Sequence, residues 1–160
     1  GGAPPPVAAP TVMATGGGAP PRDWTQLSSP LLSFGAPPLA AAARLRGHAI
    51  WVSVGPEHRD AMVEADAAVG ALLAGGAAAL CGLTIQRHAA AAWTYRRAPR
   101  GTPWPWPSLS PAFDAHLRRA CGGVWVPDVP GWATSALVAE DVLWALGSNR
   151  RVMVEAASWP

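Results

Sequence analysis

Lysine is absent from this sequence, and all 12 basic residues are arginine. The chain has 10 acidic residues, so the formal net charge is only +2, and the arginines form no dense basic run. Proteins that bind nucleic acids usually present a concentrated basic patch or stripe. We therefore expect no nucleic-acid partner.

Cysteine is equally scarce, with only Cys81 and Cys121 in the chain. Two cysteines cannot build a disulfide framework. The CxxC and HExxH spacings that hold zinc are also missing from the sequence. We expect neither a metal site nor a cofactor.

Uninterrupted apolar runs are short. A membrane-spanning helix needs about 20 consecutive apolar residues, and the most apolar stretch, residues 67–83, is interrupted by glycines. No signal peptide is visible either. We expect no membrane contact, and a location in the cytoplasm or within a viral or phage particle.

Alanine, glycine, proline, arginine and tryptophan are abundant, and because their codons are GC-rich, the composition indicates a GC-rich genome. Half of the residues are apolar and 14% are charged, which suits one folded domain with a real core and not a typical disordered chain. Nine tryptophans in 160 residues are unusual. We expect some of them at a partner or ligand surface.

The chain divides into three regions by composition. Residues 1–22 are a tail or linker rich in proline, glycine and alanine. We expect this tail to pack on the flank of its own domain or on a protein neighbour, which a homo-oligomer would supply. Residues 23–47 are an irregular lead-in broken by prolines, with a short helix over residues 38–45. Residues 48–160 form a single α/β domain.

The first strand of that domain is predicted at residues 48–54, with the sequence HAIWVSV. Gly55 turns the chain into a helix that has Pro56 at its first position and acidic residues near its positive end. The helix stops at two glycines, residues 75–76. The next strand is best placed at residues 83–86.

The region that follows is less regular, and residues 89–97 suit a helix or a strand. Residues 100–107 carry alternate prolines, which remove backbone donors and exclude regular structure. Between these prolines, Trp104 and Trp106 form a rigid aromatic display that can stack on a base or clamp a partner. A lid that packs over the core is the alternative.

A further helix is predicted to open at Ser110 and Pro111, as cap and first helical residue. Its apolar face repeats every four residues, through Phe113, Leu117 and Cys121. We expect Gly122 to end it in the left-handed conformation.

The last part of the chain has the clearest pattern. A strand at residues 124–126, a proline- and glycine-rich turn, a helix capped by Thr134 or Ser135, and a strand at residues 150–155 follow one another. Gly147 ends the helix. Strand, helix and strand in about 35 residues make a parallel crossover unit.

Alternating strands and helices favour an α/β fold with a mainly parallel sheet. Right-handed crossovers then predict a three-layer, flavodoxin-like or Rossmann-like sandwich of four to five strands. Such sheets bind ligands at the carboxyl ends of their strands. The candidate binding residues therefore lie at the end of the strand over residues 48–54 and in the loops after it and after residues 124–126. They are Ser53, Gly55, Pro56, His58, Asp128, Gly131, Trp132, Thr134 and Ser135.

These two loops resemble those of the nucleoside 2-deoxyribosyltransferase-like superfamily, which includes nucleotide N-glycosidases and small phage and bacterial relatives. The resemblance covers roughly residues 48–156. Its first motif is a strand that ends in Gly-Pro before a helix, here Gly55 and Pro56. Its second motif is Pro-Gly-Trp, a small hydroxyl residue and a helical Glu followed by Ala and Gly, here Pro130, Gly131, Trp132, Thr134 or Ser135, Glu140, Ala145 and Gly147.

The resemblance implies that Glu140 is the nucleophile or the central catalytic carboxylate, and that Thr134 or Ser135 helps to hold a phosphate or a sugar. A carboxylate beneath the sugar C1 can attack or stabilise the oxocarbenium-like centre of a breaking glycosidic bond. Simpler roles remain open. Glu140 can be a solvated residue near the helix N-terminus, the hydroxyl residue a helix cap, and His58 a solvated surface residue.

The sequence leaves two functions open. The first is a nucleoside or nucleotide N-glycosidase or deoxyribosyltransferase-like enzyme, active or degenerate, that uses Glu140 and no cofactor. The second is a non-catalytic structural or assembly module, for example of a viral or phage particle or a multisubunit complex. Such a module would bind its partners through residues 1–22 and the tryptophan-rich loop.

Overall fold

The computed structural model of the chain describes residues 20, 21, 23–96, 100 and 106–160, with residues 106–111 described by their backbone alone. Most of the predicted tail and Trp104 lie outside the described residues. Trp106 is the first residue of a helix, and its side chain is not described.

Five strands form one sheet in the order β1-β5-β4-β2-β3, and every described strand pair is parallel. The strands are β1 (Leu32–Ser33), β2 (Ala49–Val52), β3 (Ala78–Leu80), β4 (Cys121–Val126) and β5 (Arg151–Val154). The predicted α/β class with a mainly parallel sheet is confirmed.

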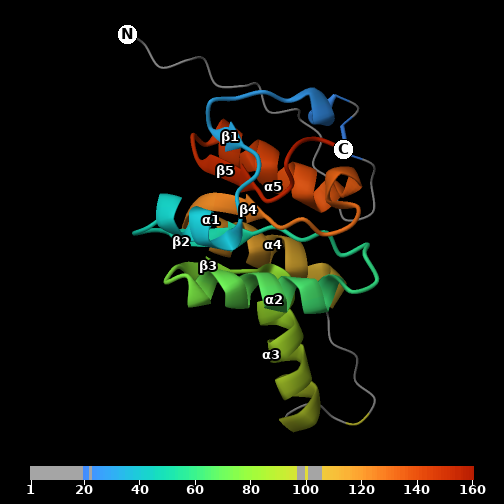
Figure 1. Cartoon of the computed structure of the whole chain (residues 1–160). Coiled ribbons are helices and arrows are strands. Elements are labelled where there is room, and N and C mark those ends of the chain that lie inside the picture. The colour runs from blue at the N-terminus through green and yellow to red at the C-terminus, as the bar shows by residue number, and fades with distance from the viewer. Residues whose placement is uncertain (1–19, 22, 97–99, 101–105) are drawn as a thin grey trace.

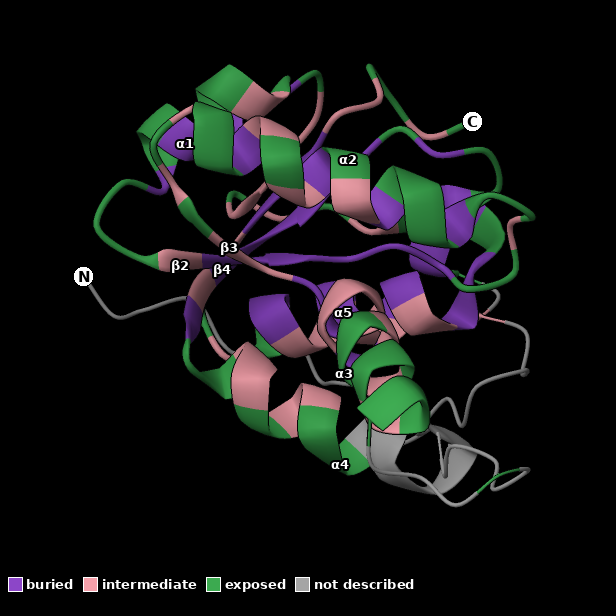
Figure 2. Cartoon of the chain, turned by 90° about the horizontal axis from the view of Figure 1, so that it is seen from below, coloured by how far each residue is buried: buried purple, intermediate pink, exposed green. Residues whose placement is uncertain are grey.

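Helices cover both faces of the sheet, so the domain has three layers, with the sheet between two layers of helices. The helices are α1 (Pro38–Arg44), α2 (Ala61–Ala74), α3 (Gly82–Arg96), α4 (Trp106–Arg119) and α5 (Ala136–Gly147), with short 3-10 turns η1 (Trp24–Gln26) and η2 (Trp132–Thr134). Figure 1 shows α3 projecting from the body of the domain. In Figure 2, α1 and α2 lie on one side of the strands, and α3, α4 and α5 lie on the other.

The strands alternate their side chains between the two layers, as the period of two in a strand requires. In β2, Ile50 and Val52 belong to the core cluster beneath α1 and α2, whereas Trp51 belongs to the cluster beneath α5. In β4 the residues in register lie on the matching sides, because Val124, paired with Trp51, faces α5, and Trp125, paired with Val52, faces α1. Burial on both faces explains why these strands are apolar throughout.

The lead-in over residues 23–47 is more ordered than its prolines predict. β1 pairs with β5 and completes the edge of the sheet. The indole N–H of Trp24 donates to the carbonyl of Ala133 (2.7 Å), and that of Trp125 donates to the carbonyl of Ala36 (3.0 Å). Two buried indole bonds thus hold the lead-in against the domain, and the predicted short helix is confirmed as α1.

The strand predicted at residues 83–86 is wrong. The strand is β3, which follows the Gly75–Gly76 turn directly, and residues 83–86 lie inside α3. Thr84 and Ile85 are β-branched and suggested a strand, but Thr84 Oγ1 donates to Asp66 of α2 (2.9 Å) from a helix that packs on α2. Tertiary contacts override β-propensity here. The same helix continues to Arg96, so residues 89–97, left open by the sequence, are helical as far as they are described.

The next predicted helix has both ends misplaced. α4 begins at Trp106 instead of Ser110, so the end of the proline-rich stretch is helical. Pro107 is tolerated because the first turn of a helix needs no backbone donors. At the other end, Cys121 and Gly122 belong to β4 and not to the helix. A Cβ atom on Gly122 would clash with His48, so this glycine permits close packing and is not a left-handed cap.

The remaining helix ends compare well with the prediction, with one exception. Pro56 does not start α2, because residues 56–60 form turns and the helix begins at Ala61. The predicted stop at Gly75 and Gly76 is confirmed. Ser135, one of the two candidate caps, accepts a hydrogen bond from the Val138 N–H at the start of α5.

Candidate functional site

The carboxyl ends of β2 and β4 enclose a cavity of about 220 Å³. The chain leaves β2 through α2 to reach β3 on one side and returns through α3 and α4 to β4 on the other, so the two strands flank a topological switch point. This is the position at which open α/β sheets bind ligands. The cavity is lined by Ser53, Val54, Gly55, Glu57, His58, Pro127, Val129, Pro130, Gly131, Trp132, Thr134 and Ser135.

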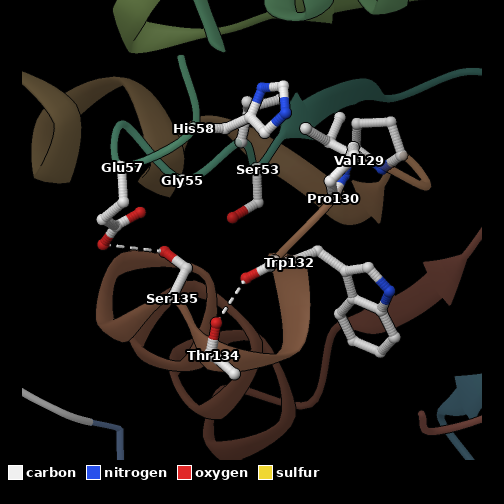
Figure 3. Close-up of a pocket in the computed structure, with 12 residues that line it drawn as sticks. Ser53, Gly55, Glu57, His58, Val129, Pro130, Trp132, Thr134 and Ser135 are labelled. Atoms are coloured by element: carbon white, nitrogen blue, oxygen red, sulfur yellow. Dashed lines mark hydrogen bonds between the residues drawn. The ribbon is translucent and has the colours of Figure 1, made fainter. Parts of the chain in front are cut away.

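Most of the binding residues predicted from the sequence meet in this cavity (Figure 3). Those that line it are Ser53, Gly55, His58, Gly131, Trp132, Thr134 and Ser135. Pro56, Asp128 and Glu140 are not among the lining residues. Asp128 is exposed, and its N–H donates to Glu155 Oε1 (2.8 Å). Glu57 lines the cavity although the sequence marked it only as an acidic residue near a helix start.

Gly55 allows the two loops to approach each other. Its missing side chain leaves room for Ser135 and Glu57, both of which a Cβ atom at this position would meet too closely. Across that gap, Ser135 Oγ donates to Glu57 Oε1 (3.3 Å). The floor of the cavity is buried at Ser53 and Ser135, whereas Glu57 at its rim is exposed.

A buried carboxylate lies directly behind the floor. Asp141 of α5 accepts from Ser53 Oγ (2.6 Å) and from the indole N–H of Trp51 (3.0 Å) through Oδ2, and from Arg118 Nη1 (2.8 Å) through Oδ1. Burial raises the pKa of Asp141, and the bonds from Ser53, Arg118 and Trp51 oppose that rise. Trp51 and Arg118 can only donate, and they reach both oxygens, so Asp141 accepts these bonds as a carboxylate.

Glu140, the catalytic carboxylate implied by the resemblance, lies beside this network and not in the cavity. Its Oε1 is 4.0 Å from Arg118 Nη1, and its side chain is part-exposed. Burial and the negative charge of Asp141 raise its pKa, while Arg118 opposes the rise. Side chains of successive helical residues point about 100° apart. The side chain of Asp141 therefore points toward the cavity floor, whereas that of Glu140 does not.

The sequence contained one signal for Asp141. The buried apolar residues of α5 include Val138, Val142 and Ala145, and Asp141 lies among them at helical spacing. A charged residue on an apolar helical face needs a partner. Its partners could not be read from the sequence, since Trp51 and Ser53 are 90 and 88 residues away.

The network extends to α3 and α4. The Arg118 guanidinium lies 4.6 Å from the ring centroid of Trp144, and its buried Nε has no hydrogen-bond partner among the described residues. Asp114 accepts from Gln86 Nε2 (3.1 Å). Burial, with a smaller contribution from the charge of Asp141, raises the pKa of Asp114 to about 6.

Trp132 is a wall of the cavity and not a free stacking platform. It is 7% exposed, and its ring stacks on Trp159 at 5.3 Å between centroids. Trp24 meets both rings edge-on. In Figure 3 the indole extends away from Glu57 and Ser135. Trp24, Trp51 and Trp125 are buried as well, so these three tryptophans and Trp132 pack in the interior, and of the four Trp132 lines the cavity.

Comparison of the chain with known protein families, with curated proteins and with solved structures finds no match. Within the described part of the chain, no helix has the length and apolar character needed to cross a membrane. Among the same residues, no group of three or more His, Cys, Asp or Glu side chains could hold a metal ion.

The neighbours Asp141 and Glu140 should differ sharply in their contribution to stability. Asp141→Ala removes the acceptor of the bonds from Trp51, Ser53 and Arg118 and leaves the guanidinium without its hydrogen-bonded carboxylate, which should lower the free energy of unfolding by about 3–5 kcal/mol. Glu140→Ala removes a part-exposed ion pair and should cost about 1 kcal/mol or less. Urea denaturation of both variants measures the difference, and equal costs would contradict the buried network.

Asp114 should make the protein less stable as the pH rises from about 4 to about 6. Its pKa is higher in the folded state than in the unfolded chain, so protonation favours folding. The stabilisation from protonation is fully present below about pH 4 and is lost once the pH exceeds the folded pKa. The effect is at most about 3 kcal/mol, because a tenfold change in proton affinity is worth about 1.4 kcal/mol.

Asp114→Asn keeps an oxygen for Gln86 and removes the titration. Urea denaturation across this pH range should therefore give a flatter profile for the variant than for the wild type. Identical slopes would show that Asp114 titrates normally.

Proposed function

We propose that the protein binds a nucleoside or nucleotide in the cavity between β2 and β4 and cleaves or exchanges its N-glycosidic bond. The observation that carries this proposal is that both loops of the resemblance, 78 residues apart at Glu57 and Ser135, line one cavity at the switch point of the sheet. Ser53, Gly55 and His58 come from the first loop, and Trp132 and Ser135 come from the second. The resemblance names these two loops, and the fold supplies a reason for them to act together.

The size of the cavity suits part of such a ligand. At about 220 Å³ it is smaller than the roughly 300–1,000 Å³ of sites that enclose drug-sized molecules. A pentose ring can enter, and the remainder of a nucleoside would extend past the exposed rim at Pro130 and Thr134.

The chemistry needs a carboxylate near the sugar carbon whose bond to the base breaks. Charge builds on the sugar as it becomes oxocarbenium-like, and a carboxylate can stabilise that charge or attack the carbon. Glu57 is the carboxylate that lines the cavity among the described residues. We therefore assign this role to Glu57 in the first place, with Glu140 as the competing residue from the resemblance.

The test is incubation of the protein with a panel of nucleosides and nucleoside 5′-monophosphates, with free base measured by chromatography. We expect base release by the wild type and a loss of about 100-fold or more in Glu57→Gln, a typical effect of removing a group that acts on the reacting atoms. Glu140→Gln is the matched variant.

A loss confined to Glu140→Gln would move the catalytic role to Glu140. If the folded wild type releases base from no member of the panel, the catalytic proposal is wrong.

A second candidate, a non-catalytic assembly module, is favoured by the outer surface of α1 and α2. Leu39, Val63 and Leu73 are 70%, 67% and 54% exposed, and Met62 lies beside them on α2. Within α2 only Glu64 and Asp66 are charged. A helix with apolar residues on its outer side as well as its inner side is typical of a helix that is buried on both sides. In the single chain, no other described element packs on the outer side of α2 (Figure 2).

For this candidate we propose that the α1–α2 surface pairs with the same surface of a second copy of the chain, since twofold dimers are the most common oligomers. Light scattering over a dilution series should give the mass of a dimer for the wild type and of a monomer for Val63→Glu. Tyr95→Ser, which changes an exposed aromatic residue on α3, should remain dimeric. A wild type that is monomeric at every concentration would exclude this assembly.

A further inference from the structure

The hydroxyl of Ser53 presents lone pairs to the cavity, because its proton is already used. Ser53 Oγ donates to Asp141 Oδ2 at 2.6 Å. The other partners of Asp141, the indole of Trp51 and the guanidinium of Arg118, can only donate. The carboxylate is therefore an acceptor on all sides, and it fixes the direction of the Ser53 proton.

The other two hydroxyls of the cavity are committed in the same way. Thr134 Oγ1 donates to the carbonyl of Gly131 (3.0 Å), and Ser135 Oγ donates to Glu57 (3.3 Å). Ser135 Oγ also accepts from the Val138 N–H, which uses one of its lone pairs. All three hydroxyl protons of the cavity thus point to protein acceptors, as Figure 3 shows for Thr134 and Ser135.

The second loop offers few backbone donors. Pro127 and Pro130 have no N–H group. Four other lining residues of this loop use their N–H groups to donate to carbonyl oxygens of the same loop, and these are Val129, Trp132, Thr134 and Ser135. The N–H group of Gly131 makes no such bond. A phosphate needs several converging donors, and this loop does not supply them.

The charged and aromatic side chains of the cavity point to the same conclusion. No arginine is among the lining residues, and Glu57 is acidic. His58 Nδ1 accepts from the Asp60 N–H (3.1 Å), so the neutral ring carries its proton on Nε2 and can donate one bond. The indole nitrogen of Trp132 extends away from the cavity in Figure 3.

We propose that this cavity selects an uncharged, hydroxyl-bearing ligand, the sugar of a free nucleoside, and disfavours a nucleoside 5′-monophosphate. Ligand hydroxyls would donate to Ser53 Oγ and to Glu57, and the ring or sugar oxygen would accept from His58. The inference rests on the proposed function, because it names which of the two ligand classes the same cavity takes. It also assigns Asp141 as a positioning residue, since it acts only through the Ser53 hydroxyl.

One feature of the fold favours the opposite ligand. The N-terminus of α5, capped by Ser135, lies at the floor of the cavity, and helix N-termini attract anions. Ser135 Oγ caps the Val138 N–H and is bonded in turn to the carboxylate of Glu57. The helix end is therefore already occupied by a negative group of the protein.

The experiment is calorimetric titration of the wild type with a nucleoside, with the matching 5′-monophosphate and with inorganic phosphate. We expect the nucleoside to bind about tenfold or more tightly than the monophosphate. The phosphate oxygens only accept hydrogen bonds, and in this cavity they would face side-chain oxygens that also accept. Inorganic phosphate should give no heat. Ser53→Ala removes the acceptor of a ligand hydroxyl and should weaken the nucleoside about tenfold. An unchanged nucleoside affinity would contradict this contact.

Glu57→Gln tests the charge at similar side-chain size. It replaces the carboxylate by an amide that can donate, so the ratio of the two affinities should fall toward one. Asp60→Asn removes an equal charge from an exposed carboxylate three residues away, outside the lining residues, and should keep the wild-type ratio.

The outcomes separate the two proposals. Tighter binding of the monophosphate, or binding of inorganic phosphate, overturns the selectivity inferred here and leaves the proposed function standing. A folded protein that binds neither nucleoside nor monophosphate overturns both.

Discussion

A single buried carboxylate joins the parts of the fold that surround the cavity. Asp141 on α5 receives hydrogen bonds from Trp51 and Ser53 at the end of β2 and from Arg118 on α4. A charge in this position is stable only if each partner is in place. The bonds therefore require the sheet, the helix after β4 and the helix before it to assemble in one arrangement, and they set the floor of the cavity as they do so.

The cavity depends on close approach as well as on charge. Gly55 lets the loop after β2 reach the N-terminus of α5, and Gly131, at a φ of 81°, turns the loop after β4 back toward the helix. Between them, the bond from Ser135 to Glu57 closes one side. The result is a small pocket with a buried floor and an exposed acidic rim, in which the polar side chains are arranged by the protein before any ligand arrives.

The aromatic residues stabilise this arrangement from outside. Trp132 is held between Trp24 of the lead-in and Trp159 near the end of the described chain, with Phe34 beside Trp159. Residues outside the segment from β2 to β4 thus hold one wall of the cavity in place. Four of the tryptophans, Trp24, Trp51, Trp125 and Trp132, are buried and contribute to internal packing.

The sequence by itself determined the class of fold, the apolar strands β2, β4 and β5, a helix cap at Thr134 or Ser135, and the two loops whose residues meet in the cavity, because each depends on residues close together in the chain. Only the tertiary structure decided that residues 83–86 are helical, that β1 completes the sheet, and that Glu57 lines the cavity while Glu140 does not. It also decided that Asp141 faces Ser53. The physical reason is that rotation about a helix axis is set by what packs against the helix, and the partners of Asp141 on β2 lie about 90 residues earlier in the chain.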